Sequence, residues 1–173
     1  MAGEHAAARL EPDGHLTVFT AQAPNGQSHE TTLAQIAATE FGLPLEHVSI
    51  RWGDTSFSPY SALGTGGSRA ATMASGSTLL ATREVKRKVL DYAADMLEAA
   101  AEDLKIADAS VFVGGDPASG LSLGEVAQMI YFLASGWRGT GSALRRHFPG
   151  ATWRLVGRHP RLHRRGRPPR PEP

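Results

Sequence analysis

The segment that decides the fold reads Arg9-Leu-Glu-Pro-Asp-Gly-His-Leu-Thr-Val-Phe-Thr20. Within it, Pro12-Asp13-Gly14 has the composition of a tight turn, because Pro presets φ and Gly accepts a positive φ. The residues that follow, from His15 to Thr20, alternate in polarity and include β-branched side chains, which is typical of a strand. The sequence therefore predicts a β-hairpin over residues 8–21.

A helix and a further strand are predicted after this hairpin. Apolar side chains recur at helical spacing from about Glu30 to Phe41, and Gly42 stands where helices commonly end. After a short connector, His47 to Trp52 alternates between apolar and polar residues, which indicates a strand. The strand–helix–strand order points to a layered structure of helices on a sheet.

The longest predicted element is a helix that starts at Ser68 or Arg69 and runs to Leu104. Its first part, residues 70–77, has mostly small side chains, and Gly76 lowers helix stability by about 1 kcal/mol relative to Ala. Such small side chains predict that another backbone or a bulky ligand approaches closely there. Its second part carries an apolar stripe at helical spacing: Val85, Val89, Tyr92 and Met96.

The last predicted elements are a strand and a capped helix. Ser110 to Val113 reads as a short strand, closed by a turn from Gly114 to Pro117. Ser122 and Glu125 have the spacing of a capping box, which opens a helix to about Leu133. No internal repeat is visible. The order strand–strand–helix–strand–helix–strand–helix predicts an α+β fold, with one long helix packed on a small mixed sheet.

Composition excludes several classes of protein. The chain has 173 residues and no cysteine, which excludes a disulfide scaffold, a cysteine-ligated zinc or iron–sulfur site and a cysteine nucleophile. No apolar run reaches the roughly 18 residues of a transmembrane helix. The first residues lack the basic and apolar regions of a secretory signal. We therefore expect a cytoplasmic location and no membrane partner.

The net charge of +1 conceals two unlike parts. Residues 1–137 hold 8 basic and 16 acidic residues, whereas residues 138–173 hold 10 Arg, no Lys and one acid. We expect residues 1–137 to fold and the Arg/Pro-rich tail, residues 138–173, to be disordered. Three interpretations of the tail stay open: a plain disordered extension, an arm that binds nucleic acid or a membrane surface, or a segment translated out of frame. The acidity of the first part argues against nucleic acid as a partner.

Two loops lead into predicted helix N-termini, where free backbone N–H groups and the positive end of the helix dipole favour anions. In the first, residues 25–32, Gln27 can donate and accept hydrogen bonds at once. The second reads Gly64-Thr65-Gly66-Gly67-Ser68-Arg69. Its glycines permit close approach of a ligand, and Arg69 stands where it could pair with a phosphate.

Structural roles are the alternative for the same residues. Ser28 or Thr31 could cap the first helix with His29 solvated, and Ser68 could cap the second helix. Asp54, which follows a predicted strand, fits an Asx turn better than a catalytic acid. The histidines have no metal-ligand spacing, so no metal site is expected.

Five short segments share their order and spacing with one known family: Gly26–Ile36, Gly42–Pro44, Val48–Thr55, Pro59–Tyr60 and Gly64–Arg69. They resemble the molybdenum hydroxylases, the family of xanthine dehydrogenase and aldehyde oxidase. The likeness is greatest to the large subunit of aerobic carbon monoxide dehydrogenase, and it covers about residues 8–133.

The resemblance implies that residues 1–137 are part of a molybdopterin-binding domain within a much longer large subunit. It implies molybdopterin with molybdenum as cofactor, in bacteria often as the cytosine dinucleotide. The implied partners are the remainder of the large subunit and the iron–sulfur and flavin subunits. The residues it implies for cofactor binding are Gln27, Ser28, His29, Thr31, Thr65, Gly66, Gly67, Ser68 and Arg69.

The resemblance also implies an incomplete catalytic apparatus. The general base of the family is a Glu in a Gly-rich segment near the far C-terminus of the large subunit, and an upstream loop carries a Cys in the carbon monoxide enzyme; neither is expected in this chain. General acid–base help is typically worth about 10²–10⁴-fold in rate. We therefore expect part of a molybdenum-dependent oxidoreductase with no catalytic residue of its own. A non-enzymatic remnant or interaction module is the alternative.

Overall fold

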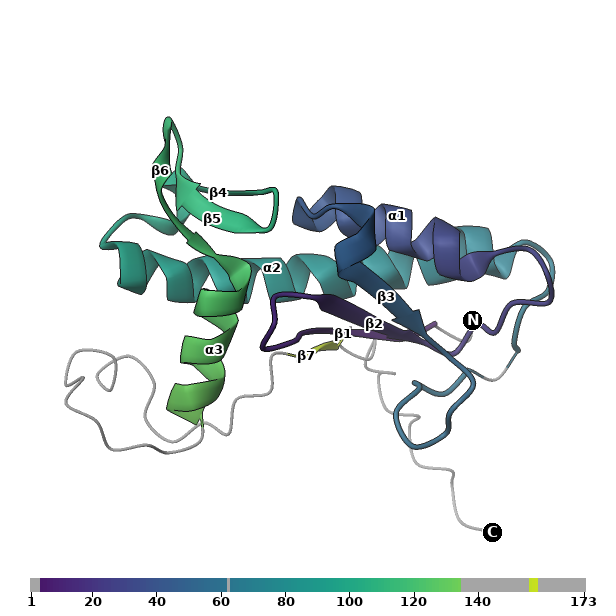
Figure 1. Ribbon diagram of the computed structural model, residues 1–173. Helices are drawn as coiled ribbons and strands as arrows, with labels where there is room; N and C mark the ends of the chain where they lie inside the picture. The colour runs from purple at the N-terminus through teal and green to yellow at the C-terminus, as the bar shows by residue number, and fades with distance from the viewer. Residues whose placement is uncertain (1–3, 62, 135–155, 159–173) are drawn as a thin grey trace, which may run out of the picture.

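A computed structural model describes residues 4–61, 63–134 and 156–158. They form two small sheets and three α-helices with short 3₁₀ and π-helical turns (Figure 1). The elements are β1 (Ala6–Leu10), β2 (Leu16–Thr20), α1 (His29–Phe41), η1 (Leu45–His47), β3 (Val48–Arg51), η2 (Ala70–Ala74), α2 (Ser75–Leu97), η3 (Ala101–Asp103), β4 (Leu104–Ala107), β5 (Ser110–Val113), β6 (Asp116–Ser122), α3 (Leu123–Ala134) and β7 (Val156–Arg158).

The predicted hairpin is confirmed as β1 and β2, which pair antiparallel from Ala6 opposite Thr20 to Leu10 opposite Leu16. Gly14 has a φ of 87° in the turn between them. The two strands are central in a four-stranded sheet of order β3-β2-β1-β7, where β2 and β3 are parallel and the other pairs are antiparallel. The predicted mixed sheet is therefore confirmed.

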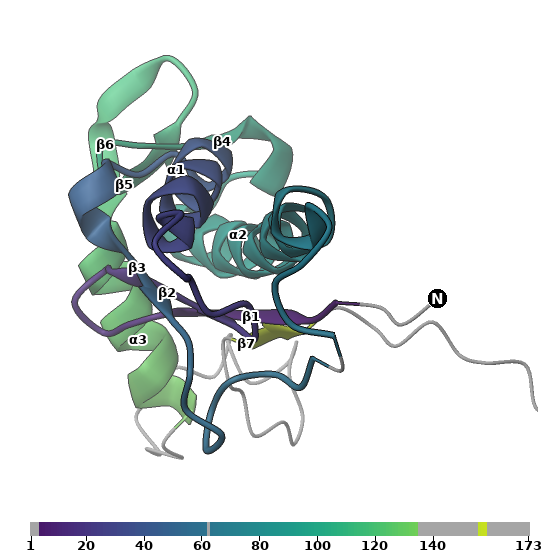
Figure 2. The same cartoon turned by 90° about the vertical axis from the view of Figure 1, so that its right-hand side faces the viewer.

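Helices α1 and α2 lie side by side on one face of this sheet (Figures 1 and 2). The core between the layers contains Leu16 and Val18 from the sheet, Phe41 from α1, and Val85 and Val89 from α2, all at least nine-tenths buried. The apolar stripe predicted on the long helix is thus the surface that faces the core. Burial of each such side chain contributes about 1.5–3 kcal/mol to folding.

The end of α1 follows the prediction. Gly42 adopts the left-handed conformation, with a φ of 91°, and its N–H donates to the carbonyl of Ala38. The N–H of Leu43 donates to the same carbonyl at 3.0 Å, so the Ala38 carbonyl accepts from two donors where the helix ends. A Cβ added at Gly42 would collide with the carbonyl oxygen of Ile106 in β4.

The predicted end of the long helix is wrong. The helix ends at Leu97, and Leu104 begins strand β4. Glu98 takes the left-handed position, with a φ of 51°, and the N–H of Ala99 donates to the carbonyl of Ala94 at 3.1 Å. Neither Gly nor Pro marks the end of the helix, and the residues that follow Leu97 are mostly Ala and Glu, which favour helices. The sequence therefore predicted a helix that continues beyond Leu97. The first turns, Ala70–Ala74, are π-helical.

The structure contains a second sheet of order β4-β5-β6. Only its middle strand, β5, was predicted from the sequence. The turn between β4 and β5 places Asp108 and Ala109 at φ values of 47° and 57°. A two-residue hairpin turn of this kind normally has the sequence Asn-Gly or Asp-Gly. Because Ala109 stands where Gly is usual, the sequence did not predict the turn. The predicted turn after β5 is shorter than expected, because β6 already starts at Asp116.

The capping box is confirmed at the start of α3. The Glu125 carboxylate accepts from the Ser122 N–H at 2.8 Å, and Ser122 Oγ accepts from the Glu125 N–H at 3.2 Å. The same helix start packs against the β1–β2 turn, where a Cβ added at Gly14 would lie 2.9 Å from the nitrogen of Gly124. Glycine at both positions lets the two backbones touch.

Within the predicted tail, the structure describes Val156–Arg158, which is strand β7 paired antiparallel with β1. These three residues are ordered in a strand, where disorder was expected. The other residues of the tail lie outside the described residues. The interpretation of the tail as a segment translated out of frame therefore stays a prediction. None of the helices in the described part of the chain combines the length and apolar character that crossing a bilayer requires.

Candidate functional site

The two candidate loops lie at the same end of the molecule (Figures 1 and 2). One joins β2 to α1 and the other joins β3 to η2 and α2. Because β2 and β3 are adjacent parallel strands, with Phe19 opposite Arg51, both loops leave the same edge of the sheet. Ligands of open α/β sheets bind outside the carboxyl ends of such strands. The structure thus brings together two loops that the sequence predicted separately.

The first loop exposes Gln27 and Ser28 and turns His29 inward. The Gln27 side-chain oxygen accepts a hydrogen bond from the N–H of Asn25, so its amide group can still donate. Ser28 has a φ of 53°, and its carbonyl accepts from the N–H groups of Thr31 and Thr32, each at 3.2 Å.

The predicted cap of α1 is not formed by a side chain. No side-chain hydrogen bond caps this N-terminus within the described residues. Thr31 is exposed on the first turn. His29 is 9% exposed, contrary to the solvated alternative, and its Nδ1 has no hydrogen-bond partner in the described part of the chain. The helix start therefore keeps donors for a group that approaches from outside.

The second loop exposes Gly66, Gly67 and Ser68. Gly67 and Ser68 have φ values of 56° and 60°, and the N–H of Arg69 donates back to the carbonyl of Gly66 at 3.1 Å. No described side chain caps the helical turn that follows. The loop therefore presents mostly backbone to its surroundings, which suits close approach by a ligand.

The two loops are tied together by Thr65. Its Oγ1 lies 2.8 Å from Gln22 Oε1 and 3.0 Å from the carbonyl oxygen of Ala23, and both are acceptors for its single proton. Gln22 is fully buried, directly after β2. This contact fixes the second loop against the start of the first.

A buried polar cluster beneath these loops was missed by the sequence analysis. It consists of Glu4, Gln22, Ser61, Thr65 and Arg69, and we refer to it as the Glu4 cluster. Its centre is Glu4 Oε2, which accepts hydrogen bonds from Gln22 Nε2 at 2.8 Å, Ser61 Oγ at 3.1 Å and Arg69 Nη2 at 3.3 Å. The partners lie 18, 57 and 65 residues from Glu4, so no local spacing could reveal the cluster.

Asp54 behaves as the Asx-turn interpretation predicts. Its carboxylate accepts hydrogen bonds from the side chain and, at 2.8 Å, from the N–H of Ser56, and these bonds hold the pKa of Asp54 below its ordinary value. Within the described residues, no group of three or more His, Asp or Glu side chains is arranged to hold a metal ion.

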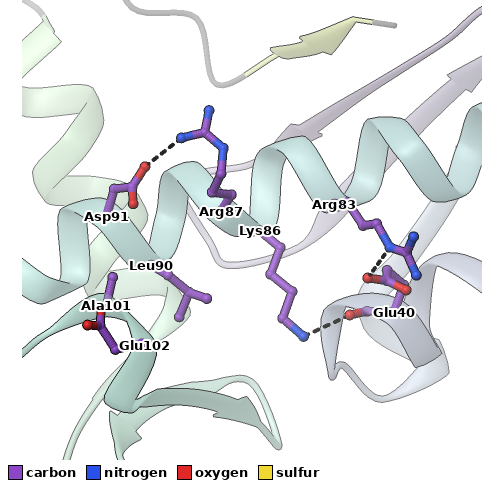
Figure 3. Close-up of a pocket in the computed structure, with 8 residues that line it drawn as sticks. All are labelled: Glu40, Arg83, Lys86, Arg87, Leu90, Asp91, Ala101 and Glu102. Atoms are coloured by element: carbon purple, nitrogen blue, oxygen red, sulfur yellow. Dashed lines mark hydrogen bonds and ion pairs between the residues drawn. The ribbon is translucent and has the colours of Figure 1, made fainter.

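A surface pocket of about 300 Å³ lies elsewhere, between the C-terminal end of α1, the middle of α2 and the turn after it (Figure 3). Its basic side chains are already engaged: Arg83 Nε pairs with Glu40 at 2.8 Å, and Lys86 Nζ donates to the Glu40 carbonyl at 2.8 Å. Arg87 pairs with Asp91 at 2.9 Å. The contacts of Arg83 and Lys86 with Glu40 connect α2 to the end of α1, and the Arg87–Asp91 pair lies within α2.

Comparison with known protein families identifies the domain. The sequence model of the molybdopterin cofactor-binding domain matches residues 1–155. The chain belongs to this family. The matched residues extend past the expected domain boundary at residue 137.

Several relatives of this molybdopterin cofactor-binding domain are large subunits. The nicotine 6-hydroxylase large subunit of Paenarthrobacter nicotinovorans is 36% identical over 132 residues, which cover 76% of this chain and 16% of that protein. The carbon monoxide dehydrogenase large chain of Hydrogenophaga pseudoflava is 37% identical over 123 residues, which cover 71% of this chain and 15% of that protein.

Solved structures agree with the fold. The crystal structure of quinoline 2-oxidoreductase from Pseudomonas putida 86 superposes with a TM-score of 0.75 at 36% identity, over 92% of this chain and 19% of that chain. The α+β architecture is therefore that of a molybdenum hydroxylase fragment, as predicted. The domain spans less than a fifth of the length of these relatives.

Proposed function

We propose that this molybdopterin cofactor-binding domain forms one wall of the cofactor site in a molybdenum-dependent oxidoreductase. The single observation that carries the proposal is the meeting of the two loops at the carboxyl ends of β2 and β3, where Thr65 Oγ1 contacts the Ala23 carbonyl at 3.0 Å. Each loop runs into a helix start that no described side chain caps.

The residues present fit a phosphorylated pterin. Uncapped helix N-termini offer backbone N–H donors and a positive dipole end, which favour a phosphate or pyrophosphate. The exposed Gln27 amide is a further polar group at this end of the molecule, and the buried Nδ1 of His29 has no partner within the described residues. The residues assigned to the cofactor are Gln27, Ser28, His29 and Thr31 from the first loop and Thr65, Gly66, Gly67, Ser68 and Arg69 from the second.

When bound, molybdopterin with its molybdenum supplies the redox chemistry, and this chain binds and orients it. No residue of the chain is assigned a catalytic role. We propose the cytosine dinucleotide form, because relatives at 37% and 42% identity are named as carbon monoxide dehydrogenase large chains. The proposal includes a cytoplasmic complex in which the rest of a large subunit, an iron–sulfur subunit and a flavin subunit complete the enzyme.

Cofactor content tests this proposal. The full chain is produced in a bacterial host that makes the cytosine dinucleotide cofactor, and purified protein is analysed for molybdenum by mass spectrometry and for pterin by fluorescence after oxidation. We expect both to copurify, with cytidine monophosphate released on acid hydrolysis. Protein that contains neither molybdenum nor pterin above an unrelated purified control would contradict the proposal and favour a non-enzymatic interaction module.

A further inference from the structure

We propose that Glu4 is a positioning residue for the cofactor site. Arg69, which was assigned to the site with its loop, serves it through the ion pair of its guanidinium with Glu4 and does not contact the phosphate with its side chain. In this assignment the Arg69 guanidinium holds the second loop in place, and the loop backbone contacts the phosphate. The inference rests on the proposed function, because it concerns how the loop of that same site is kept in its binding arrangement.

The first step of the argument is burial. The Glu4 side chain is fully buried, and the Arg69 side chain is 21% exposed. Arg69 Nη2 lies 3.3 Å from Glu4 Oε2, so the cation faces the interior of the domain. A carboxylate removed from water requires hydrogen bonds and an opposite charge to be tolerated. Glu4 Oε2 obtains both from segments that are distant in sequence, whereas the buried Oε1 has no hydrogen-bond partner within the described residues.

The second step is the placement of the anchors on the loop. Thr65 is held by Gln22, and Gln22 is held in turn by Glu4. Arg69 is held by Glu4 directly. The Glu4 cluster therefore fixes both ends of the segment whose centre, residues 66–68, is exposed. Glycine-containing backbone has many accessible conformations, so these two anchors restrict what the loop can adopt.

The third step concerns charge. Because Glu4 lies against the guanidinium, the pair carries little net charge toward a ligand. Attraction for a phosphate at this loop then comes from backbone N–H groups and the helix start. This arrangement separates two tasks, since the ion pair sets the position of the loop and the backbone makes the contact.

Hydrogen exchange of the full chain tests the positioning role without any cofactor. In Glu4→Gln the amide can still accept from Ser61, but the charge that holds Arg69 is gone. We expect the amides of Gly64 and Arg69, which donate to Ser61 and Gly66, to exchange about tenfold faster, with exchange in β2 and β5 unchanged. The matched control is Arg83→Gln, which removes the 2.8 Å ion pair with Glu40 on the far part of α1 and α2. It should leave the loop unchanged.

Cofactor retention gives the second readout. Arg69→Gln and Glu4→Gln should each lower molybdenum content about tenfold, and the double variant should be no worse than Glu4→Gln alone, because both act through one contact. Arg69→Lys keeps the charge and should recover part of the loss. If Glu4→Gln precipitates, Arg69→Gln, whose side chain is partly exposed, provides the same exchange measurement.

The outcomes separate the alternatives. Loss of cofactor in Arg69→Gln with unchanged loop exchange would make Arg69 a direct ligand and overturn the proposal. Faster exchange throughout the domain in both variants would mean a general stabilising role and would overturn it too. A wild-type chain without molybdenum would refute the proposed function, while the exchange result would still decide whether Glu4 positions the loop.

Discussion

Glycine serves opposite purposes at the two ends of this domain. At the end with the proposed cofactor site, Gly26, Gly64 and Gly67 have positive φ values, and an added Cβ would meet no described atom within 4 Å. At the other end, Gly42 and Gly14 also have positive φ values, but an added Cβ would strike Ile106 or Gly124. The first group leaves a surface open, and the second lets backbones pack together. Fold stability and the proposed cofactor binding therefore depend on different glycines.

The largest expected effect is at the packed end. Gly42→Ala should lower the free energy of unfolding by about 3 kcal/mol, because the left-handed backbone costs about 1–2 kcal/mol and the collision with Ile106 adds to it. Gly26→Ala has the same backbone cost without a collision, so it should lose only about 1–2 kcal/mol. Urea denaturation of the full chain measures both values. Equal losses in the two variants would remove the distinction between open and packed glycines.

A smaller effect of opposite sign is expected in the β4–β5 turn. Ala109 has a φ of 57°, a conformation that costs a non-glycine residue about 1–2 kcal/mol. Ala109→Gly should therefore raise the free energy of unfolding by about 1 kcal/mol after the entropy lost by glycine on folding is counted. Ala118→Gly on exposed β6 is the control and should not stabilise the chain. A lower melting temperature for Ala109→Gly would show that the turn is not strained.

The smallest effect depends on pH. Hydrogen bonds from the Ser122 side chain and backbone lower the pKa of Glu125 in the folded chain. Its contribution to stability is thus present above the ordinary carboxyl pKa and is lost as pH falls through the lowered value. The melting-temperature difference between the wild type and Glu125→Gln should shrink as the solution is acidified. A difference that stays constant with pH would show that ionised Glu125 adds nothing to the capping box.

Local signals made much of the fold predictable. Gly42 predicted the end of α1, and the Ser122–Glu125 pair predicted the start of α3. Both predictions were possible because each signal acts on residues within one turn of itself. The stop at Glu98 and the turn at Ala109 were missed, since neither is a residue type that favours the left-handed backbone found there.

The candidate site likewise has parts that the sequence predicted and parts that only the fold reveals. Both loops were visible from their composition, but their union depends on the parallel register of β2 and β3. The Glu4 cluster joins residues up to 65 positions apart, so only the folded chain reveals it. Glu4 on its own reads as an ordinary acidic residue near the start of the sequence.

The most direct test of the cofactor site is the molybdenum content of Gly66→Val. Gly66 is exposed, lacks a positive φ, and has no described atom within 4 Å of an added Cβ, so the substitution should leave the fold intact while obstructing the loop surface. The account predicts that Gly66→Val retains about a tenth or less of the wild-type molybdenum and pterin, whereas Ala118→Val on β6 retains all of it. Full retention by Gly66→Val would contradict the claim that this loop contacts the cofactor.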